Sequence, residues 1–530
     1  MKLAPAHPIT RKIPLSLKIL TTVILAGYTM PLLLLTFFLP KAELNILEAI
    51  NLKWILLWTT GQAVLASLAA VALGVPVGIG GAWYGSKIAS SWKAAGLPIF
   101  MAPSVAVILG FRSLAEFGVI PEVAARAPLG IILVHAYYNI PLAAVLTYAS
   151  ISDRAGELAD YVKSIGIKGM KLWVKILIPA AVPGAAAAFI LAFVYSFTGL
   201  AAPLMVEASA YKYYTLEAWI YTIYWGFPSK RLAAVLLSLL QASLLLIIAV
   251  TVFRIFSDRP AVEVGSPSAA NERTTTSILL DWYSAVLLAI LYAPLVAVVA
   301  YSFVDPYTGL PSIQAYKRLI FGPLPVPPGA SFLKSLGWSI IYALATSLLS
   351  LLVSLYVALG STVRRLASMA PLTISPIVAG IAVHLTLYQL LKNIFGHIVA
   401  VAILLILVHS AMAIPLSSRA LEVGLRRVPR EALDLIVSLR LTSWKSAVLL
   451  LRAAWPGAVA AFLLAAASSL GEFGAAIVIT EPSTWSLGIL TYNLYSAGRV
   501  LHIACASAAV LELLSLLLMI IASRKMETWF

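Results

Sequence analysis

The residues that could do chemistry in this sequence are the few ionisable side chains inside long apolar runs. One of them is Glu472, which stands in the stretch Leu-Gly-Glu-Phe-Gly within such a run. A carboxylate among apolar residues is costly to bury, and it usually faces a water-filled cavity or the inside of a helix bundle. There it could meet a cationic solute. A residue that ends a helix at a membrane interface would give the same pattern, so both interpretations stay open.

Two histidines, His135 and His409, also lie inside apolar runs, one in each half of the chain. Each is followed six residues later by a proline, Pro141 or Pro415, which is expected to kink a helix. Asn139 lies between the first histidine and its proline, whereas an alanine stands at that place in the second run. His135, His409 and Asn139 therefore join Glu472 as candidates for a translocation path. Packing against a neighbouring helix through a hydrogen bond is the commoner role for such histidines.

A charged island between two apolar runs begins with Glu157 and Asp160. The stretch from Glu157 to residue 165 can form a short helix with one polar and one apolar face. Gly166 stands where that helix must end, because glycine adopts the left-handed conformation without a Cβ clash. A second helix over 167–178 is expected next, and Pro179 should open the following apolar run. The sequence thus predicts a helix–turn–helix bracket against the inner face of a membrane.

The island returns in the second half of the chain, with Glu431 and Asp434 at the positions of Glu157 and Asp160. The same offset in residue number relates the two histidines, and it becomes smaller by one after the islands, so the second copy has lost one residue. Arg440 stands where the first copy has its glycine, and a left-handed arginine would cost about 1–2 kcal/mol. We therefore expect the second turn to be reshaped. A single island would be an ordinary solvated loop, but two at matching positions suggest paired docking elements, each laying a short helix in a partner's groove.

The composition places these features in a membrane protein. The 530 residues are 61% hydrophobic and 11% charged, whereas soluble domains carry about 25% charged residues. The formal net charge is +16, but the basic residues form no tract and no patch interleaved with aromatic residues. Nucleic acid is therefore not an expected partner, and the lipid bilayer is.

A membrane-spanning helix needs about 20 mostly apolar residues, and twelve stretches qualify. They are roughly 17–39, 54–84, 97–114, 128–150, 180–203, 231–253, 278–303, 335–360, 370–391, 398–420, 456–479 and 501–523. Six spans on each side of a polar linker predict an all-α polytopic membrane protein built of two parallel six-helix repeats. The expected units are a first half over 1–253, a cytoplasmic linker over 254–277 and a second half over 278–530.

Lysine and arginine gather in the loops on one side of these spans, and the two islands are among those loops. The positive-inside rule assigns that side to the cytoplasm. We therefore expect a multi-pass protein of the plasma membrane with both termini in the cytoplasm. The opposite loops have sparse charge, and Glu217 is expected there on the outer face. The symmetry of the repeats predicts a pathway at the interface between the halves.

The motifs of common enzymes do not occur in this sequence. It has no phosphate-binding loop of the form G-x-x-x-x-G-K-S/T, no H-E-x-x-H, no G-x-S-x-G and no paired C-x-x-C. We therefore expect no enzymatic activity, and any ATP hydrolysis must come from another polypeptide. An ion-coupled secondary transporter is the alternative of another class. It would use buried ionisable groups, for which Glu472 is the one good candidate.

The first island resembles the cytoplasmic signature loop of ATP-binding-cassette importer permeases. Asp160 stands at the acidic position of that signature, Gly166 at its glycine, and Ile-Leu-Ile-Pro179 approximates its end. The second copy keeps the acidic residue as Asp434 but departs from the pattern at Arg440. The resemblance implies the type I permease fold and docking of both islands on two ATPase subunits that hydrolyse ATP. It also implies an extracytoplasmic solute-binding protein and no cofactor bound by this chain.

The fusion of two halves resembles the fused permeases for thiamine and for ferric iron. The stretch His135-Ala-Tyr-Tyr-Asn139-Ile-Pro141 and the later Thr-Leu-Glu217 are similar to the thiamine branch. Permeases for sulfate, molybdate and tungstate share much of the same frame. The resemblance therefore implies import of a small solute, with thiamine as the first choice and ferric iron or an oxyanion as alternatives.

Overall fold

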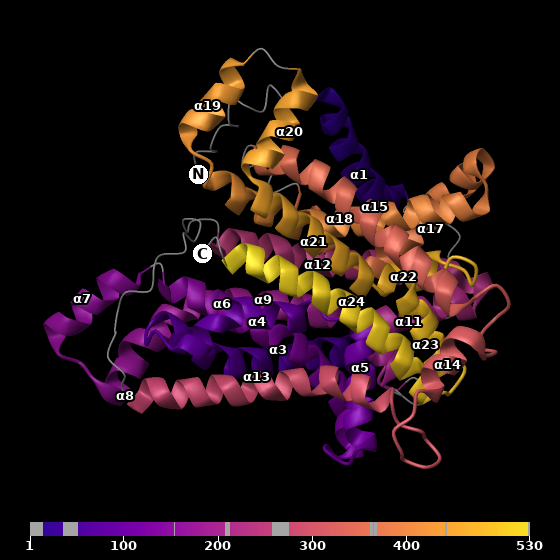
Figure 1. Cartoon of the computed structure of the whole chain (residues 1–530), viewed down its shortest axis with the longest axis horizontal. Helices are drawn as coiled ribbons and strands as arrows, with labels where there is room; N and C mark the ends of the chain where they lie inside the picture. Colours follow the sequence, from indigo (N-terminus) through magenta and orange to yellow (C-terminus); the bar gives the residue numbers. More distant parts are fainter. Residues whose placement is uncertain are drawn as a thin grey trace.

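The structure is a computed structural model that describes residues 14–34, 51–152, 154–206, 212–256, 275–360, 364, 368–439 and 442–527. Apart from one isolated bridge between Val304 and Pro311, all regular elements among these residues are helices (Figure 1). Ten described helices are long and apolar enough to cross a membrane, or up to twelve if each of two bent pairs counts as one span. The chain is therefore an all-helical, multi-pass membrane protein.

The helices up to residue 256 are called the N-terminal set here. They are α1 (Leu15–Leu34), α3 (Leu52–Ala82), α4 (Lys87–Phe100), α5 (Ser104–Glu116), α6 (Leu129–Ser152), α7 (Ala155–Ile165), α8 (Gly169–Leu172), a π-helical turn (Trp173–Leu177), α9 (Ile178–Phe197), α10 (Ala201–Met205), α11 (Leu216–Gly226) and α12 (Arg231–Phe256). Short 3-10 turns occur at Glu122–Ala125 and Pro228–Lys230.

The helices from residue 275 onward are called the C-terminal set. They are α13 (Thr275–Tyr301), α14 (Gln314–Phe321), α15 (Phe332–Ala358), the 3-10 turn η7 (Ala370–Thr373), α17 (Pro376–Phe395), α18 (His397–Arg426), α19 (Arg430–Ser438), α20 (Ser443–Ala453), α21 (Trp455–Gly471), α22 (Gly474–Ile479), α23 (Leu487–Ser496) and α24 (Leu501–Glu527). Both α12 and α13 reach a few residues into the linker expected over 254–277, and residues 257–274 lie outside the described residues.

Two of the spans expected as single helices are broken. The apolar run 97–114 contains the end of α4 and most of α5, which meet at an angle of 96°. Pro103 stands at the start of α5 and disfavours a helical conformation of the residue before it. The run 456–479 is divided at Glu472, which has an extended backbone between α21 and α22. Apolarity marks where these segments lie, but it does not mark where they turn.

The helix expected over 167–178 is not separate from the next span. The chain is continuously helical from Gly169 to Phe197, through a π-helical turn in which the N–H of Ile178 donates to the carbonyl of Trp173. This wider turn precedes Pro179, which has no N–H to donate. The C-terminal set differs here, because α20 and α21 meet at 91°.

Three long helices pack together in the same way in each set. In the N-terminal set α3, α6 and α9 contact one another, and in the C-terminal set α15, α18 and α21 do. Glycines allow the close approach. A Cβ added at Gly78 of α3 would lie 2.6 Å from that of Thr147 on α6, and one added at Gly424 of α18 would lie 2.8 Å from the Cα of Gly457 on α21.

The first helix of each set packs on the other set. Helix α1 contacts α15, α17 and α18, whereas α13 contacts α3, α4 and α5. The last helix, α24, also packs against α4 and α5. The two sets are therefore joined by crossed helices as well as by direct contact, and a single apolar core includes residues of both.

A polar contact repeats between the sets. The hydroxyl of Thr59 on α3 accepts from the backbone N–H of Leu216 at the start of α11, with N and O 2.9 Å apart. The hydroxyl of Ser339 on α15 accepts from the N–H of Leu487 at the start of α23, at 2.7 Å. All four residues are buried. The short helices α11 and α23 are thus held by equivalent bonds.

Candidate functional site

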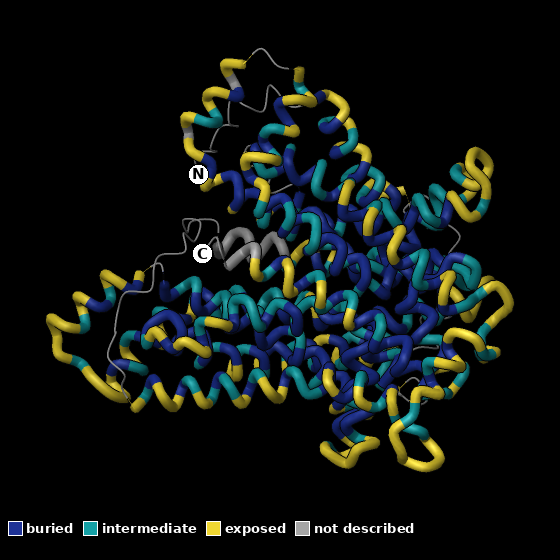
Figure 2. The backbone as a smooth tube through the Cα atoms, in the orientation of Figure 1, coloured by how far each residue is buried: buried dark blue, intermediate teal, exposed yellow. Residues whose placement is uncertain are grey.

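The first island forms the helix that the sequence predicts. Helix α7 ends at Gly166, which has φ of 65° and ψ of 20°, the left-handed conformation expected of it. Ala159 is buried against an apolar cluster that also holds Leu172, so α7 is anchored on its own set of helices. Glu157 and Asp160 are exposed, as is most of the helix (Figure 2). Pro179 is exposed as well, at the second position of α9.

The second island forms α19, which is also anchored by one apolar face. Ile436 is buried in a cluster with Leu450 of α20, while Glu431 and Asp434 are exposed. The helix ends at Leu439, whose backbone is extended with φ of −62° and ψ of 130°. The second turn thus begins differently from the first. Arg440, expected to replace the glycine, lies outside the described residues.

Both islands present apolar side chains at equivalent positions. Tyr161 and Ile165 of the first island are 54% and 41% exposed, and their counterparts in the second island, Leu435 and Leu439, are 58% and 38% exposed. Helices α7 and α19 lie at the same end of the molecule, apart from each other (Figure 1). Each therefore offers an exposed, partly apolar face beside its acidic residues.

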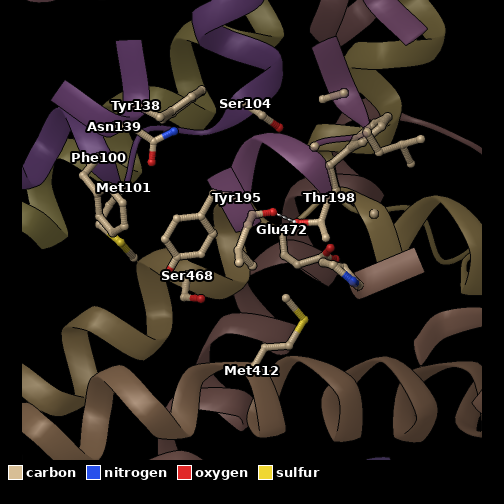
Figure 3. Close-up of a pocket in the computed structure, with 18 of the residues that line it drawn as sticks. Phe100, Met101, Ser104, Tyr138, Asn139, Tyr195, Thr198, Met412, Ser468 and Glu472 are labelled. Carbon is tan, nitrogen blue, oxygen red and sulfur yellow. Dashed lines mark hydrogen bonds between the residues drawn. The ribbon is translucent and has the colours of Figure 1, made fainter. Parts of the chain in front are cut away.

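A cavity of about 560 Å³ lies between the two sets of helices (Figure 3). Its wall includes the break between α4 and α5, part of α6 and the junction of α9 with α10. From the C-terminal set it includes the segment before α17, part of α18 and the break between α21 and α22. The rings of Phe100, Tyr138 and Tyr195 form part of its surface, with Phe100 and Tyr195 in edge-to-face contact. The broken spans thus shape the wall.

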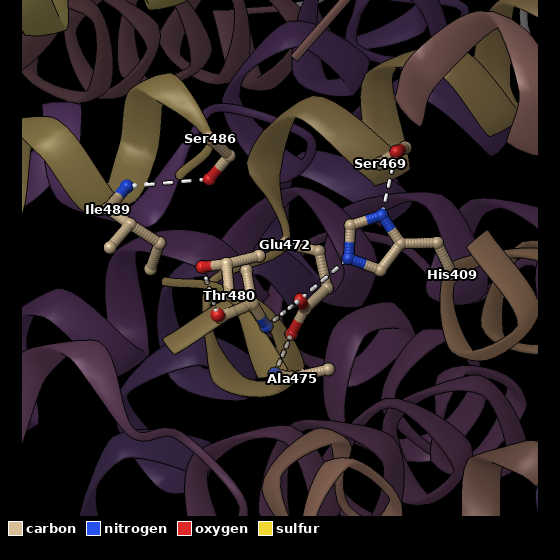
Figure 4. Close-up of polar contacts among 8 residues, drawn as sticks. His409, Ser469, Glu472, Ala475, Thr480, Ser486 and Ile489 are labelled. Atoms are coloured by element: carbon tan, nitrogen blue, oxygen red, sulfur yellow. Dashed lines mark hydrogen bonds and ion pairs between the residues drawn. The ribbon is translucent and has the colours of Figure 1, made fainter. Parts of the chain in front are cut away.

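Glu472 lines this cavity, and both oxygens of its carboxylate form hydrogen bonds (Figure 4). Oε1 accepts from the N–H of Ala475 at 2.9 Å, and Oε2 accepts from the N–H of Ala476 at 3.1 Å. Oε2 also lies 2.9 Å from Nε2 of His409. Nδ1 of that imidazole is 2.8 Å from the hydroxyl of Ser469. Glu472 therefore fixes the start of α22 and ties it to α18.

The equivalent place in the N-terminal set has no acid. His135, the counterpart of the histidine that binds Glu472, has Nδ1 2.7 Å from Oε1 of Gln62. Gly199 stands at the repeat position of Glu472, and a Cβ there would collide with Nε2 of His135. Asn139 donates to the carbonyl of His135 at 2.8 Å, and both residues line the cavity. Both sets thus place a histidine at this position, and only the C-terminal set places an acid beside it.

The sequence did not indicate that Glu217 is buried. It was expected on the outer face, but its side chain has no exposed surface and accepts a short hydrogen bond from Gln241 on α12. The expected exposure was wrong, because the partner lies on another helix, which the local sequence does not reveal. A single acid next to an apolar run is the only signal that the sequence offers.

Glu512 on α24 is a second buried acid that the sequence reasoning passed over, and it is only 1% exposed. It is the single acid in the apolar run 501–523, which is the signal that could have found it.

Arg419 also lines the cavity, and it pairs with Glu422 at 3.2 Å. Among the described residues, no group of three or more His, Cys, Asp and Glu side chains is placed to share a metal ion.

A scan against protein-family models found no matching family, and searches of curated proteins and of solved structures found no match either.

Proposed function

We propose that this chain is the transmembrane permease subunit of an ATP-binding-cassette importer in the plasma membrane, with two six-helix repeats fused in one polypeptide. Two ATPase subunits dock on α7 and α19 from the cytoplasm, the side on which both termini lie. An extracytoplasmic binding protein delivers a small solute at the opposite end. The chain itself breaks no covalent bond and binds no cofactor, and its ATPase partners hydrolyse ATP.

The pair of exposed short helices is the observation that carries the proposal. Helices α7 and α19 occupy equivalent sequence positions, lie at one end of the molecule and expose equivalent apolar residues, Tyr161 and Leu435. Exposed apolar faces rimmed by charge are typical of protein–protein contact sites, and a short helix in a groove is a common docking mode. The matching packing of α3, α6 and α9 with that of α15, α18 and α21 supports the two repeats.

In this proposal, ATP acts by changing which conformational state of the permease the ATPase subunits bind more tightly. A ligand shifts an equilibrium only by its differential affinity for the two states. ATPase subunits that close on ATP would favour the state in which α7 and α19 approach each other. Because α7 is packed on long helices of the N-terminal set, and α19 on long helices of the C-terminal set and on α1, displacement of the islands would move these two groups of helices and reshape the cavity between them.

Thiamine is the solute that we place first. The cavity is within the size range of small-molecule sites, about 300–1,000 Å³, and its wall carries the rings of Phe100, Tyr138 and Tyr195. Aromatic faces attract organic cations, and thiamine has a cationic thiazolium ring and an aromatic pyrimidine. Ferric iron and the oxyanions sulfate, molybdate and tungstate are the alternatives. Uptake of each labelled solute by cells with and without this chain would separate them.

The direct test is affinity purification of the chain from its native membrane, with mass spectrometry of the proteins that accompany it. We expect an ATPase with a phosphate-binding loop to be recovered with the wild-type chain. Asp160→Lys, Tyr161→Asp and Leu435→Asp should each reduce its recovery several-fold, because each places a charge or reverses one on a docking helix. Tyr307→Asp is the control, since Tyr307 is 92% exposed and lies outside both islands, in the loop that follows α13.

A chain that is purified alone under gentle conditions, with all variants alike, would contradict the proposal. An ion-coupled secondary transporter is then the next candidate, and one observation favours it. Glu217 and Glu512 are both buried, and buried acids in membrane helices often carry protons or ions. Solute uptake into vesicles that contain only this chain, driven by an ion gradient without ATP, would establish that alternative.

A further inference from the structure

Helix α13 exposes an apolar face along one edge of the molecule (Figure 1). Residues three or four apart share one face of a helix. The large apolar side chains exposed on the first part of α13 have this spacing, and they are Leu279, Trp282, Val286 and Ile290. Because α13 is long and apolar enough to cross a membrane, this face contacts the lipid chains. Exposed apolar side chains continue to Val296 and to Phe303, just after the helix ends.

The loop that follows α13, over residues 302–313, remains apolar and exposed although it lies beyond the helix. Tyr307, Leu310 and Ile313 are 92%, 64% and 57% exposed, and Asp305 is the only charged residue in the loop. The loop projects from the edge of the molecule that α13 forms (Figure 1), and most of it is exposed (Figure 2). A contiguous apolar surface of this kind is typical of a site that contacts a protein or a membrane.

Hydrogen bonds within the loop fix its shape. Val304 and Pro311 form a β-bridge, which closes the loop at its base. At its tip, Oδ1 of Asp305 accepts from the backbone N–H groups of Tyr307 and Thr308, at 2.8 and 3.1 Å. Side chains that accept backbone N–H groups in this way stabilise tight turns. The apolar side chains are therefore held outward by the fold of the loop.

The end of α5 extends this apolar surface on the neighbouring segment. Phe117 and Val119, directly after α5, are both exposed. The ring of Phe117 is in edge-to-face contact with that of Tyr301, the last residue of α13, with centroids 5.4 Å apart. One turn before Phe117, Arg112 pairs with Glu116 at 3.1 Å. Apolar tips beside charged groups suit the membrane interface, where aromatic residues and the ends of charged side chains gather.

We propose that the loop over residues 302–313 and the segment after α5 form a membrane-anchoring surface, which inserts into the headgroup region of the bilayer. Lipid is favoured over a protein partner because the surface directly continues the lipid-facing side of α13. Tyr307 suits this place, since its ring is apolar and its hydroxyl is polar. Apolar faces of interfacial segments reach about 5–10 Å into this region. The inference goes beyond the proposed function, because it involves neither an ATPase nor a solute.

The experiment is fluorescence quenching of a nitrobenzoxadiazole label on the full-length chain in phosphatidylcholine nanodiscs. In a Cys505→Ser background, the label is placed at Tyr307→Cys. The quenchers are a lipid with a nitroxide near its headgroup, a lipid with a nitroxide deep in its acyl chain, and iodide in the water. We expect the shallow nitroxide to quench this label several-fold more than a label at Ser496→Cys. Ser496 is the matched control, because it is exposed at the end of α23, which is too short to span a membrane.

A label at Ile290→Cys, near the middle of α13, sets the scale for lipid contact and should be quenched best by the deep nitroxide. Quenching of the Tyr307→Cys label by iodide, with no effect of either lipid, would overturn the inference and leave a protein partner as the occupant. Stronger quenching by the deep than by the shallow nitroxide would contradict a location among the headgroups. If the Tyr307→Cys variant does not fold, Leu310→Cys is labelled in its place, and the same outcomes decide.

Discussion

At the scale of single residues, the cavity wall is most informative where its two sides differ. His135 and His409 occupy equivalent places, but one faces Gly199 and the other binds Glu472. A carboxylate with three partners is held in one orientation, and it cannot turn toward a solute without breaking those bonds. The acid that the sequence singled out is therefore a structural clamp in this conformation.

Replacing Glu472 by alanine should lower the free energy of unfolding by several kcal/mol. It leaves two buried backbone N–H groups and the imidazole of His409 without their partner, and each buried polar group left unpaired costs about 1–3 kcal/mol. The measurement is unfolding by SDS titration in mixed micelles. Glu481→Ala is a matched control, because Glu481 pairs with His397 at the same 2.9 Å but both side chains are partly exposed, at 47% and 33%. Exposed pairs contribute about 0–1 kcal/mol, so equal losses in the two variants would contradict the clamp.

Gly199→Ala tests the opposite side of the wall. The added methyl group would collide with the imidazole of His135, and forcing extra volume into a packed site costs about 1–3 kcal/mol. We expect a lower unfolding midpoint in the same titration. His135→Ala should cost less in the Gly199→Ala background than alone, because the two residues are in contact. Gly61→Ala is the control, because the methyl group there meets open space, and it should show no loss of stability. If the effects of Gly199→Ala and His135→Ala simply add in the double variant, the contact between these two residues is refuted.

At the scale of elements, the sequence predicts helix ends correctly where local chemistry sets them. Gly166 ends α7 in the left-handed conformation because glycine alone adopts it without strain. The break before Pro103 was not predicted, although the proline is a local signal for it. The break at Glu472 was not predicted because the residues on both sides are equally apolar. The second break depends on His409, which lies on a different helix, α18. Bends that tertiary contacts stabilise leave little trace in an apolar run.

The contacts between elements were beyond sequence reasoning for a similar reason. The twelve apolar stretches lie close to the observed helices, but nothing local indicates that α1 packs on α17 or that α13 packs on α5. The cavity depends on those contacts, so its existence between the halves was expected only from the repeat. Glu512 was passed over because its neighbours Tyr137 and Tyr138 come from α6, far away in the sequence.

Gly166→Ala should loosen α7 without disturbing the spans. A left-handed conformation costs an ordinary residue about 1–2 kcal/mol, which corresponds to roughly 5- to 30-fold faster opening, since 1.4 kcal/mol is a factor of ten. Hydrogen exchange followed by mass spectrometry would show this as faster exchange confined to α7. Gly156→Ala is the control, because Gly156 lies inside α7 and a Cβ there meets nothing within 4 Å. Equal exchange in both variants would show that the turn does not limit α7.

At the scale of the whole molecule, the two islands lie apart at one end, and a hydrogen bond links the two sets of helices at the other. The hydroxyl of Tyr224 on α11 lies 2.7 Å from Nδ1 of His384 on α17, which links the sets at the end away from the islands. At the island end, α7 and α19 lie apart (Figure 1). Helix α7 is packed on α3, α6 and α9, and α19 is packed with α15, α18, α20 and α21 and with Leu17 of α1. A partner that draws the islands together must therefore rotate these two groups of helices against each other.

That motion can be measured as a distance between equivalent residues of the two islands. Cys505 is the only cysteine in the sequence and is buried, so in a Cys505→Ser background spin labels can be placed at Ser164→Cys and Ser438→Cys. Both serines are exposed. We expect the distance between the labels to shorten when the partner ATPases are trapped with ATP, because their closed form should bind the approached islands better.

A second labelled pair, Ser91→Cys with Ser164→Cys, provides the control. Both residues belong to the N-terminal set, and Ser91 is exposed on α4, which packs against α3 and α6. Their distance should stay constant if the set moves as one body. A shortening of both pairs would mean that α7 bends on its own turn and does not carry its set with it. No change in either pair, with the ATPases bound and ATP trapped, would refute coupling through the islands.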